Sequence, residues 1–318
     1  MKKENPKILN EYMDYLISIK SYSLESVQSY NIDLLLFFDF IKDYMNIKQD
    51  IKNFNKFILL QVKEKDVIAF LVYCNYARDN NPYTRERKLV AIRGFYNWLL
   101  DTFKNEHIKN PTENLGKIKK TIRLPKYLTL EQAKEIQHIF TSKNCNNPIK
   151  NNAIICTFLC TGIRVTELIN IQLKDVDFIN KTIRIIGKGN KERTVYLNDF
   201  CQKQLKEYMK TRQNYKCKYL FLNRGKGKYT RNGILYICKK AYDLLDLKDK
   251  HYSTHTLRHT AATLLYMYVK EDTLLLKKFL GHESVSSTQI YTHIHNFKIK
   301  EAVERNPLSN FIVDKKVR

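Results

Sequence analysis

The chain carries three short motifs near its C-terminal end: His-Thr-Leu-Arg-His (255–259), Leu-Gly-His (280–282) and Thr-Gln-Ile-Tyr-Thr-His (288–293). His255 and Arg258 are three residues apart, so a helix would turn both side chains toward one point. Arginine is permanently charged, and its planar fork of donors fits a phosphate, whereas histidine exchanges a proton near neutral pH. Tyr291 offers an oxygen nucleophile that needs activation, because the free side chain has a pKa of about 10. The pattern predicts phosphoryl transfer through a covalent enzyme intermediate.

Two further motifs lie upstream, Thr-Gly-Ile-Arg-Val-Thr-Glu-Leu (161–168) and Gly-Lys-Gly-Asn-Lys-Glu-Arg (187–193). The five motifs together resemble the tyrosine recombinases, also called the lambda integrase family, in which the nucleophilic tyrosine follows the last histidine by nine residues. The resemblance places the six catalytic positions, in the family's order, at Arg164, Lys188, His255, Arg258, His282 and Tyr291.

The resemblance also implies the roles of these residues. Tyr291 would attack the scissile phosphate, leaving a 3′-phosphotyrosyl link and a free 5′-hydroxyl. Arg164 and Arg258 would bind the non-bridging oxygens, and Lys188 would protonate the leaving 5′-oxygen. His255 would act as base or orienter for the tyrosine, and His282 would donate a hydrogen bond to the phosphate. No metal, other cofactor or ATP is expected.

The partners implied by the resemblance are double-stranded DNA with an inverted-repeat core site and further copies of the protein in a synaptic tetramer. A paralogous recombinase or an accessory protein would be a further partner. The apolar stretch Phe311-Ile312-Val313 is expected to dock on a neighbouring protomer. Docking of this tail on its own domain is the alternative.

The first third of the chain reads as helices, because apolar residues recur every three to four positions over 8–45, 65–76 and 84–100. Ser21-Tyr22-Ser23 interrupts the first stretch, and Ser23 with Ser26 offers a helix start. Residues 1–108 thus resemble the family's N-terminal helical, SAM-like core-binding domain. That domain grips DNA opposite the catalytic domain, so that the two form a C-shaped clamp.

A basic linker is expected over 109–126, where proline, glycine and charge occur with little periodicity. The catalytic domain is expected over 127–318, including a C-terminal tail. Within it, 153–170 predicts a buried helix broken at Thr161-Gly162, and 176–197 predicts a three-stranded antiparallel meander with Lys188 in its second turn. The expected fold class is therefore α+β, mainly α with a small antiparallel β meander.

Basic residues on helices, linker and loops are candidate DNA contacts, although an ordinary solvated surface explains each of them equally well. The candidates are Arg85, Arg87, Lys88, Arg93, Lys117, Lys119, Lys226, Arg231 and Lys239.

The composition favours a polyanionic partner. The 318 residues include 56 Lys and Arg against 32 Asp and Glu, a formal net charge of +24. A Lys-rich proteome from an AT-rich genome is the alternative source of this charge. No apolar run approaches the roughly 20 residues that span a bilayer, and no signal-peptide pattern begins the chain. We therefore expect a cytoplasmic protein without a membrane partner.

The seven cysteines are odd in number, scattered, and include no Cys-x-x-Cys pair. We expect reduced, mostly structural thiols and no zinc site.

Three functions fit the sequence to different degrees. A site-specific recombinase, either Xer-like for dimer resolution or a mobile-element integrase, fits all six catalytic positions. A type IB topoisomerase shares the chemistry, and a catalytically silent DNA-binding protein shares only the fold.

Overall fold

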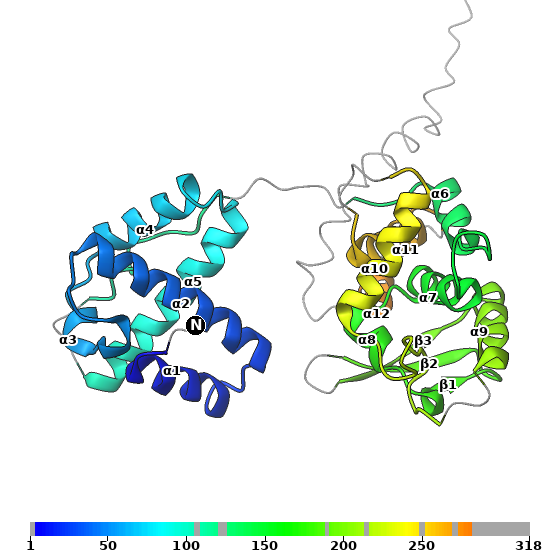
Figure 1. Ribbon diagram of the computed structural model, residues 1–318, viewed down its shortest axis with the longest axis horizontal. Coiled ribbons are helices and arrows are strands. Elements are labelled where there is room, and N and C mark those ends of the chain that lie inside the picture. Colours follow the sequence, from blue (N-terminus) through cyan, green and yellow to red (C-terminus); the bar gives the residue numbers. More distant parts are fainter. Residues whose placement is uncertain are drawn as a thin grey trace, which may run out of the picture. The chain divides into compact units, whose positions relative to one another are not determined.

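The computed structural model describes residues 4–104, 109–119, 126–187, 191–212, 216–247, 252–268 and 273–281. The chain forms two compact units, an N-terminal unit (Met1–Ile122) and a C-terminal unit (Arg123–Arg318) (Figure 1). The division between them falls inside the stretch that the sequence marks as a linker.

The N-terminal unit is helical throughout its described residues (Figure 1). Its elements are α1 (Lys7–Ser18), α2 (Leu24–Tyr44), the 3-10 helix η1 (Ile51–Asn53), α3 (Lys56–Leu59), α4 (Glu64–Tyr76) and α5 (Pro82–Phe103). Ser23 caps α2 as expected, because its hydroxyl accepts a hydrogen bond from the Ser26 amide at 3.3 Å. The four predicted helices are present. The short elements η1 and α3 were missed, because three or four residues are too few to show a helical period.

Aromatic side chains fill the core of the N-terminal unit. Phe38 of α2 meets Phe95 of α5 edge to face with 5.5 Å between ring centroids, and Phe37 meets Phe70 of α4 at 5.1 Å. All four rings are fully buried. Each contributes on the order of 1.5–3 kcal/mol by leaving water, so these contacts fix α2, α4 and α5 against one another.

A buried acid also joins α2 to α5. Asp33 is fully buried, and it accepts a hydrogen bond from Lys88 Nζ at 2.7 Å on one oxygen and from Arg87 Nη1 on the other. A solvated surface, the alternative explanation for Lys88 as a candidate DNA contact, is excluded, since the residue is only 5% exposed. A buried carboxylate requires a cation beside it, and Lys88 meets that need.

Residues 109–119 pack on the N-terminal unit, although the sequence placed them in the linker. Arg93 Nη2 donates to the Leu115 carbonyl at 2.5 Å, and the Ile118 amide donates to Glu86 Oε2 at 2.7 Å. Leu115 and Ile118 lie against the aromatic core. Arg93 therefore holds this segment in place, which its sequence neighbourhood did not indicate.

The C-terminal unit contains helices around a small sheet (Figure 1). Its helices are α6 (Leu130–Glu135), α7 (Pro148–Thr161), α8 (Val165–Asn170), α9 (Asp199–Thr211), α10 (Arg231–Leu244), α11 (Thr254–Tyr268) and α12 (Thr273–Leu280). Its short 3-10 helices are η2 (Ile136–His138) and η3 (Leu173–Asp175), and its strands are β1 (Val176–Asp177), β2 (Thr182–Ile186) and β3 (Glu192–Tyr196).

Helix α7 is the central element of this unit and packs against α9 and α11. Its side chains are buried along most of its length. The hydroxyls of Thr157 and Thr161 donate to carbonyls one turn earlier at 2.7 and 2.6 Å, so these buried polar groups are satisfied. The helix ends at Gly162, whose positive φ of 59° favours glycine. The predicted break in the 153–170 segment is confirmed.

The predicted meander is also confirmed. The three strands pair antiparallel in the order β1-β2-β3. Ile183 pairs with Val195 and Ile185 pairs with Arg193, so the four side chains project to the same face of the sheet. Ile183, Ile185 and Val195 belong to the hydrophobic core. Arg193 is thus a charged residue on the face of the sheet that packs against the core.

Within the described residues, no helix combines the length and the apolar character that crossing a membrane requires. The seven cysteines are free thiols.

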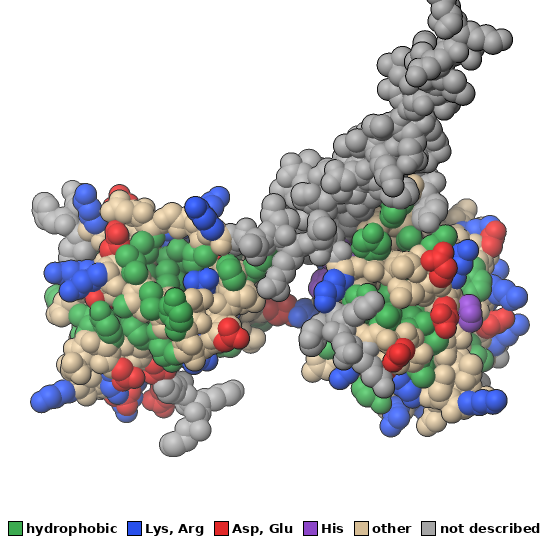
Figure 2. Space-filling view, turned by 90° about the horizontal axis from the view of Figure 1, so that it is seen from above, with side chains coloured by type: hydrophobic (Ala, Val, Ile, Leu, Met, Phe, Trp, Pro, Cys, Tyr) green, Lys and Arg blue, Asp and Glu red, His purple; other side chains and the backbone are tan. Residues whose placement is uncertain are grey.

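One face of the N-terminal unit gathers hydrophobic side chains, with lysines and arginines around its edge (Figure 2).

Candidate active site

Arg164 is placed by the turn between α7 and α8. The left-handed Gly162 ends α7, and Arg164 then adopts an extended conformation, with φ −81° and ψ 155°, as the residue preceding α8. The chain therefore leaves α7 and enters α8 within a few residues. The Arg164 side chain is 37% exposed, which leaves its guanidinium accessible to a ligand.

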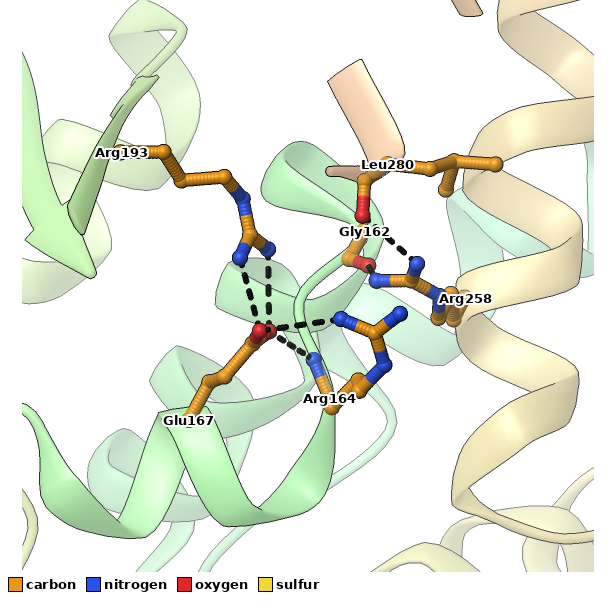
Figure 3. A network of polar contacts seen from close by, with 6 residues as sticks. All are labelled: Gly162, Arg164, Glu167, Arg193, Arg258 and Leu280. Atoms are coloured by element: carbon orange, nitrogen blue, oxygen red, sulfur yellow. Dashed lines mark hydrogen bonds and ion pairs between the residues drawn. The ribbon is translucent and has the colours of Figure 1, made fainter. Parts of the chain in front are cut away.

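Glu167, three residues after Arg164, anchors this arginine. Its Oε2 accepts a hydrogen bond from the Arg164 amide at 2.6 Å, and its Oε1 lies 3.2 Å from Arg164 Nη1 (Figure 3). The carboxylate therefore caps α8 and orients the arginine at the same time.

Arg193 binds the same carboxylate, a role that the sequence motifs did not predict. It approaches from β3 and makes a bidentate pair, with Nη1 2.7 Å from Glu167 Oε1 and Nη2 3.0 Å from Oε2 (Figure 3). Burial raises the pKa of Glu167, but hydrogen bonds from Arg193 and the Arg164 amide, with the charges of both arginines, bring the net pKa below its ordinary value. Glu167 is thus an ionised, buried carboxylate held by two arginines.

Arg258 is buried, with 4% of the residue exposed, and projects from α11. Its Nη1 donates to the Gly162 carbonyl at 2.5 Å and its Nη2 donates to the Leu280 carbonyl at 2.7 Å (Figure 3). The two carbonyls belong to the C-terminal ends of α7 and α12. One guanidinium therefore joins three helices and lies beside the turn that carries Arg164.

His255 lies on α11, one turn before Arg258, and is exposed to solvent. Its pKa is lowered by partial desolvation first, and then by the positive charges of Arg258 and Arg164. Desolvation and the two arginines therefore favour the neutral imidazole at pH 7. His259 follows on the next turn, and burial, His255 and Arg258 lower its pKa to about 4.

The structure brings together three of the six predicted catalytic residues: Arg164, His255 and Arg258. The other three, Lys188, His282 and Tyr291, lie outside the described residues. The positions next to two of them are described. Gly187, which precedes Lys188, donates to the Lys191 carbonyl at 2.8 Å, and Gly281, which precedes His282, has a φ of 61°.

The site carries an excess of positive charge. Arg164, Arg193 and Arg258 supply three charges and Glu167 removes one, which leaves +2 beside a neutral His255. A net charge of +2 beside the partly exposed Arg164 guanidinium suits a phosphate group. In the part of the chain that the structure describes, no cluster of three or more His, Cys, Asp or Glu side chains could hold a metal ion.

The candidate DNA contacts differ in their exposure. Arg85 and Arg93 are half-buried, and Arg87 is exposed but paired with Asp33. The remaining candidates, apart from the buried Lys88, have exposed side chains: Lys117, Lys119, Lys226, Arg231 and Lys239.

Comparison with known families accounts for this arrangement. A model of the phage integrase family matches residues 126–297, and a model of the phage integrase N-terminal SAM-like domain matches residues 9–102. The chain belongs to the phage integrase family. The two matches assign the N-terminal unit of this family member to the SAM-like domain and the C-terminal unit to the integrase domain. The predicted combination of a SAM-like helical domain with a mainly α catalytic domain is confirmed.

Relatives of this phage integrase family member include Xer proteins from several bacteria. Tyrosine recombinase XerC of Caldanaerobacter subterraneus subsp. tengcongensis is 39% identical over 317 residues, covering 96% of this chain and 88% of the relative. Tyrosine recombinase XerC of Anoxybacillus flavithermus is 34% identical, covering 90% and 92%. Tyrosine recombinase XerD of Rickettsia prowazekii is 28% identical, covering 95% and 97%.

Solved structures share the fold of this family member. The XerH site-specific recombinase bound to difH substrate, in a pre-cleavage complex, is 25% identical with a TM-score of 0.70, covering 93% of this chain and 83% of that one. The Tn1549 transposon integrase in complex with transposon right end DNA is 16% identical with a TM-score of 0.71, covering 94% and 99%. The latter likeness concerns the fold alone.

Proposed function

We propose that this protein is a site-specific tyrosine recombinase that cuts and rejoins DNA strands through a 3′-phosphotyrosyl intermediate. The observation that carries the proposal is the hydrogen bond from Arg258 to the carbonyl of Gly162, two residues before Arg164. This bond joins the two arginine motifs, which lie far apart in the sequence, at one turn. His255 supports the proposal, since both arginines act on its pKa.

In the proposed reaction, the Tyr291 oxygen attacks the scissile phosphorus in line with the 5′-oxygen. A phosphorus–oxygen bond to Tyr291 forms as the bond to the 5′-oxygen breaks. The tyrosine proton passes to His255, which is neutral at pH 7 and so able to accept it. Lys188 protonates the departing 5′-oxygen, and His282 donates a hydrogen bond to the phosphate.

Arg164 and Arg258 would bind the non-bridging oxygens, whose negative charge repels the nucleophile until it is neutralised. The net charge of +2 supports this role, because it persists after Glu167 has formed its ion pairs. The positive charge that neutralises these oxygens would thus come from the protein's own arginines. The phosphotyrosyl link conserves the energy of the broken bond, so rejoining to another 5′-hydroxyl requires no ATP.

The proposed substrate is double-stranded DNA with an inverted-repeat core site, bound by both units. Two protomers would bind each core site, and two sites would assemble into a synaptic tetramer. Residues 311–313 would dock on a neighbouring protomer. An exposed apolar stripe on α4 supports protein contacts in such an assembly, since Ile68, Val72 and Tyr76 are 44%, 50% and 82% exposed at helical spacing.

We further propose an Xer-like role in resolving chromosome or plasmid dimers in the cytoplasm. The XerC of Caldanaerobacter supports this role, because the likeness extends over 96% of this chain. Integration or excision of a mobile element, with or without a paralogous partner, uses the same chemistry and is the second candidate. The Tn1549 integrase, which shares the fold, belongs to a transposon.

A plasmid assay tests recombination directly. Supercoiled DNA carrying two direct copies of the bacterial dimer-resolution site, or of the junction sequence flanking the gene, is incubated with the protein, and plasmids with one copy or none serve as controls. A recombinase yields two smaller circles only from the two-copy plasmid. Relaxation of all three plasmids without new circles would instead indicate a type IB topoisomerase and would overturn the proposal.

A further inference from the structure

Arg193 occupies a position that the six-residue catalytic set does not explain. Its strand register turns the side chain toward the hydrophobic core, opposite Ile185. A charged side chain in such a position is costly unless it is paired. The partner is Glu167, whose side chain is 3% exposed while that of Arg193 is 18% exposed.

Arg193 also lies close to Gly187 and Gly281, the glycines that precede the predicted catalytic residues Lys188 and His282. A Cβ atom added to Gly281 would lie 2.8 Å from Arg193 Nε and 2.9 Å from its Cδ and Cζ, so any side chain there would displace the arginine. A Cβ atom on Gly187 would lie 3.6 Å from both Arg193 Nη1 and Glu167 Oε1. One guanidinium therefore lies against the start of the hairpin and against the residue after α12.

The two arginines compete for the charge of Glu167. Arg193 makes two short contacts with the carboxylate, at 2.7 and 3.0 Å, whereas the Arg164 side chain makes one at 3.2 Å. The bidentate pair with Arg193 is the stronger one, and it offsets most of the negative charge of the carboxylate. Arg164 is consequently oriented by Glu167 but is not neutralised by it, and its charge remains available to a ligand.

We propose that Arg193 is a positioning residue for DNA cleavage: by saturating Glu167 it leaves the Arg164 guanidinium free to bind the scissile phosphate, and by packing on Gly281 it fixes the segment that leads to His282. The proposal rests on the recombinase function proposed above. Arg193 does not touch the DNA in this account, and it acts through Glu167 and Gly281.

The geometry requires an arginine at this position. The carboxylate is held by two parallel N–H bonds, while the third edge of the guanidinium, at Nε, faces Gly281. Nε is buried and has no hydrogen-bond partner among the described residues. A lysine offers a point charge without this planar fork. Arg193→Lys should therefore recover only part of what Arg193→Gln loses.

The test is single-turnover cleavage of a nicked duplex, with the DNA dissociation constant and the thermal unfolding temperature measured in parallel. We expect Arg193→Gln to slow cleavage about 10- to 100-fold, the range for misplaced catalytic groups, while the DNA dissociation constant changes much less. Arg193→Lys should be intermediate. A cleavage rate for Arg193→Gln equal to that of the wild type would overturn the proposal.

Arg184→Gln is the matched control. Arg184 lies on the neighbouring strand and also pairs with a largely buried acid, Asp175, at 2.8 Å, but its ion pairs among the described residues are with Asp175 and Glu192, not with Glu167. This variant should lose comparable stability and keep its cleavage rate. If Arg184→Gln slowed cleavage as much as Arg193→Gln, the effect would be general destabilisation, and the positioning role would be refuted.

Two further measurements separate positioning from a structural role. Adding Glu167→Gln to Arg193→Gln should slow cleavage by less than the product of the two single defects, because both changes act on the same ion pair. With a methylphosphonate at the scissile position, one non-bridging oxygen and its charge are gone, so the defect of Arg193→Gln should shrink. Multiplying defects in the double variant, or an equal defect on both substrates, would contradict the proposal.

The design also separates this proposal from the proposed function. If the wild-type protein forms no covalent adduct on any substrate, the recombinase function fails, whatever the Arg193 variants do. If the wild type cleaves and Arg193→Gln cleaves equally well, only the positioning role fails. Should Arg193→Gln not fold, the Arg193→Lys variant carries the same comparison.

Discussion

Arg258 donates a hydrogen bond from Nη2 to the carbonyl of Leu280 at 2.7 Å, which ties α11 to the last residue of α12. The same guanidinium holds the end of α7 through the carbonyl of Gly162. An arginine assigned to phosphate binding therefore also holds three helices together through its hydrogen bonds. This double role distinguishes Arg258 from Arg164, whose side chain is anchored at one carboxylate and is 37% exposed.

Replacing each arginine by lysine should reveal this difference. Arg258→Lys should lower the free energy of unfolding by about 1–3 kcal/mol, because at least one buried carbonyl loses its donor. Arg164→Lys should leave stability nearly unchanged. Both variants should slow cleavage at least about 100-fold, the cost of losing one donor to the developing charge. Chemical denaturation and single-turnover cleavage measure the two effects, and equal losses of stability would count against the account.

Lys88 and Lys239 form a matched pair of basic residues, one inside a domain and one exposed. Lys88→Ala should destabilise the N-terminal unit by about 1–3 kcal/mol, since Asp33 keeps only Arg87 as a partner. It should not change the salt dependence of DNA binding. Lys239→Ala should leave stability unchanged and reduce the slope of log affinity against log salt by about 0.9, the value for one phosphate contact.

The salt dependence is measured by fluorescence anisotropy with a labelled core-site duplex. For the wild type the affinity should fall steeply with salt, because the net charge of +24 predicts several phosphate contacts. A nearly flat dependence would refute the assignment of the exposed lysines and arginines to DNA binding. A reduced slope for Lys88→Ala would show that Lys88 reaches DNA after all.

The pH profile of cleavage should reflect His255. Its pKa lies below the ordinary value of 6.5, because desolvation and the neighbouring arginines disfavour the imidazolium. A neutral base is therefore retained as the pH falls, and the acid limb of the cleavage rate should have its midpoint below pH 6.5. Single-turnover rates between pH 5 and 8 measure it. His255→Gln should lose this limb along with most of the rate, whereas a wild-type midpoint above 6.5 would contradict the assignment.

Much of the architecture could be predicted from local patterns. The helical period gave α1, α2, α4 and α5, the alternation of β-branched residues gave the meander, and Gly162 marked the break before Arg164. These features depend on residues that are close in sequence. The pairing of Arg164 with Glu167 belongs to the same class, because three residues separate them on one helical turn.

The remaining features depend on which segments meet in space. Asp33 and Lys88 are 55 positions apart, and nothing local to Lys88 shows that it faces a buried acid. Asp33 itself carried a signal, because it precedes the core residue Phe37 by one helical turn. Arg193 carried another, since it alternates with Val195 and Leu197 on the inward face. In both cases a charged residue at an apolar register position indicated a buried ion pair.

The central claim is that Tyr291 forms a covalent bond with DNA. The most direct measurement incubates a nicked suicide duplex of the core site with wild-type and Tyr291→Phe protein, without added metal, and resolves covalent adducts on a denaturing gel. The account predicts an adduct at the 3′-phosphate for the wild type alone, with DNA affinities within a few-fold of each other. An adduct that persists with Tyr291→Phe, or a collapse of DNA binding in that variant, would contradict it.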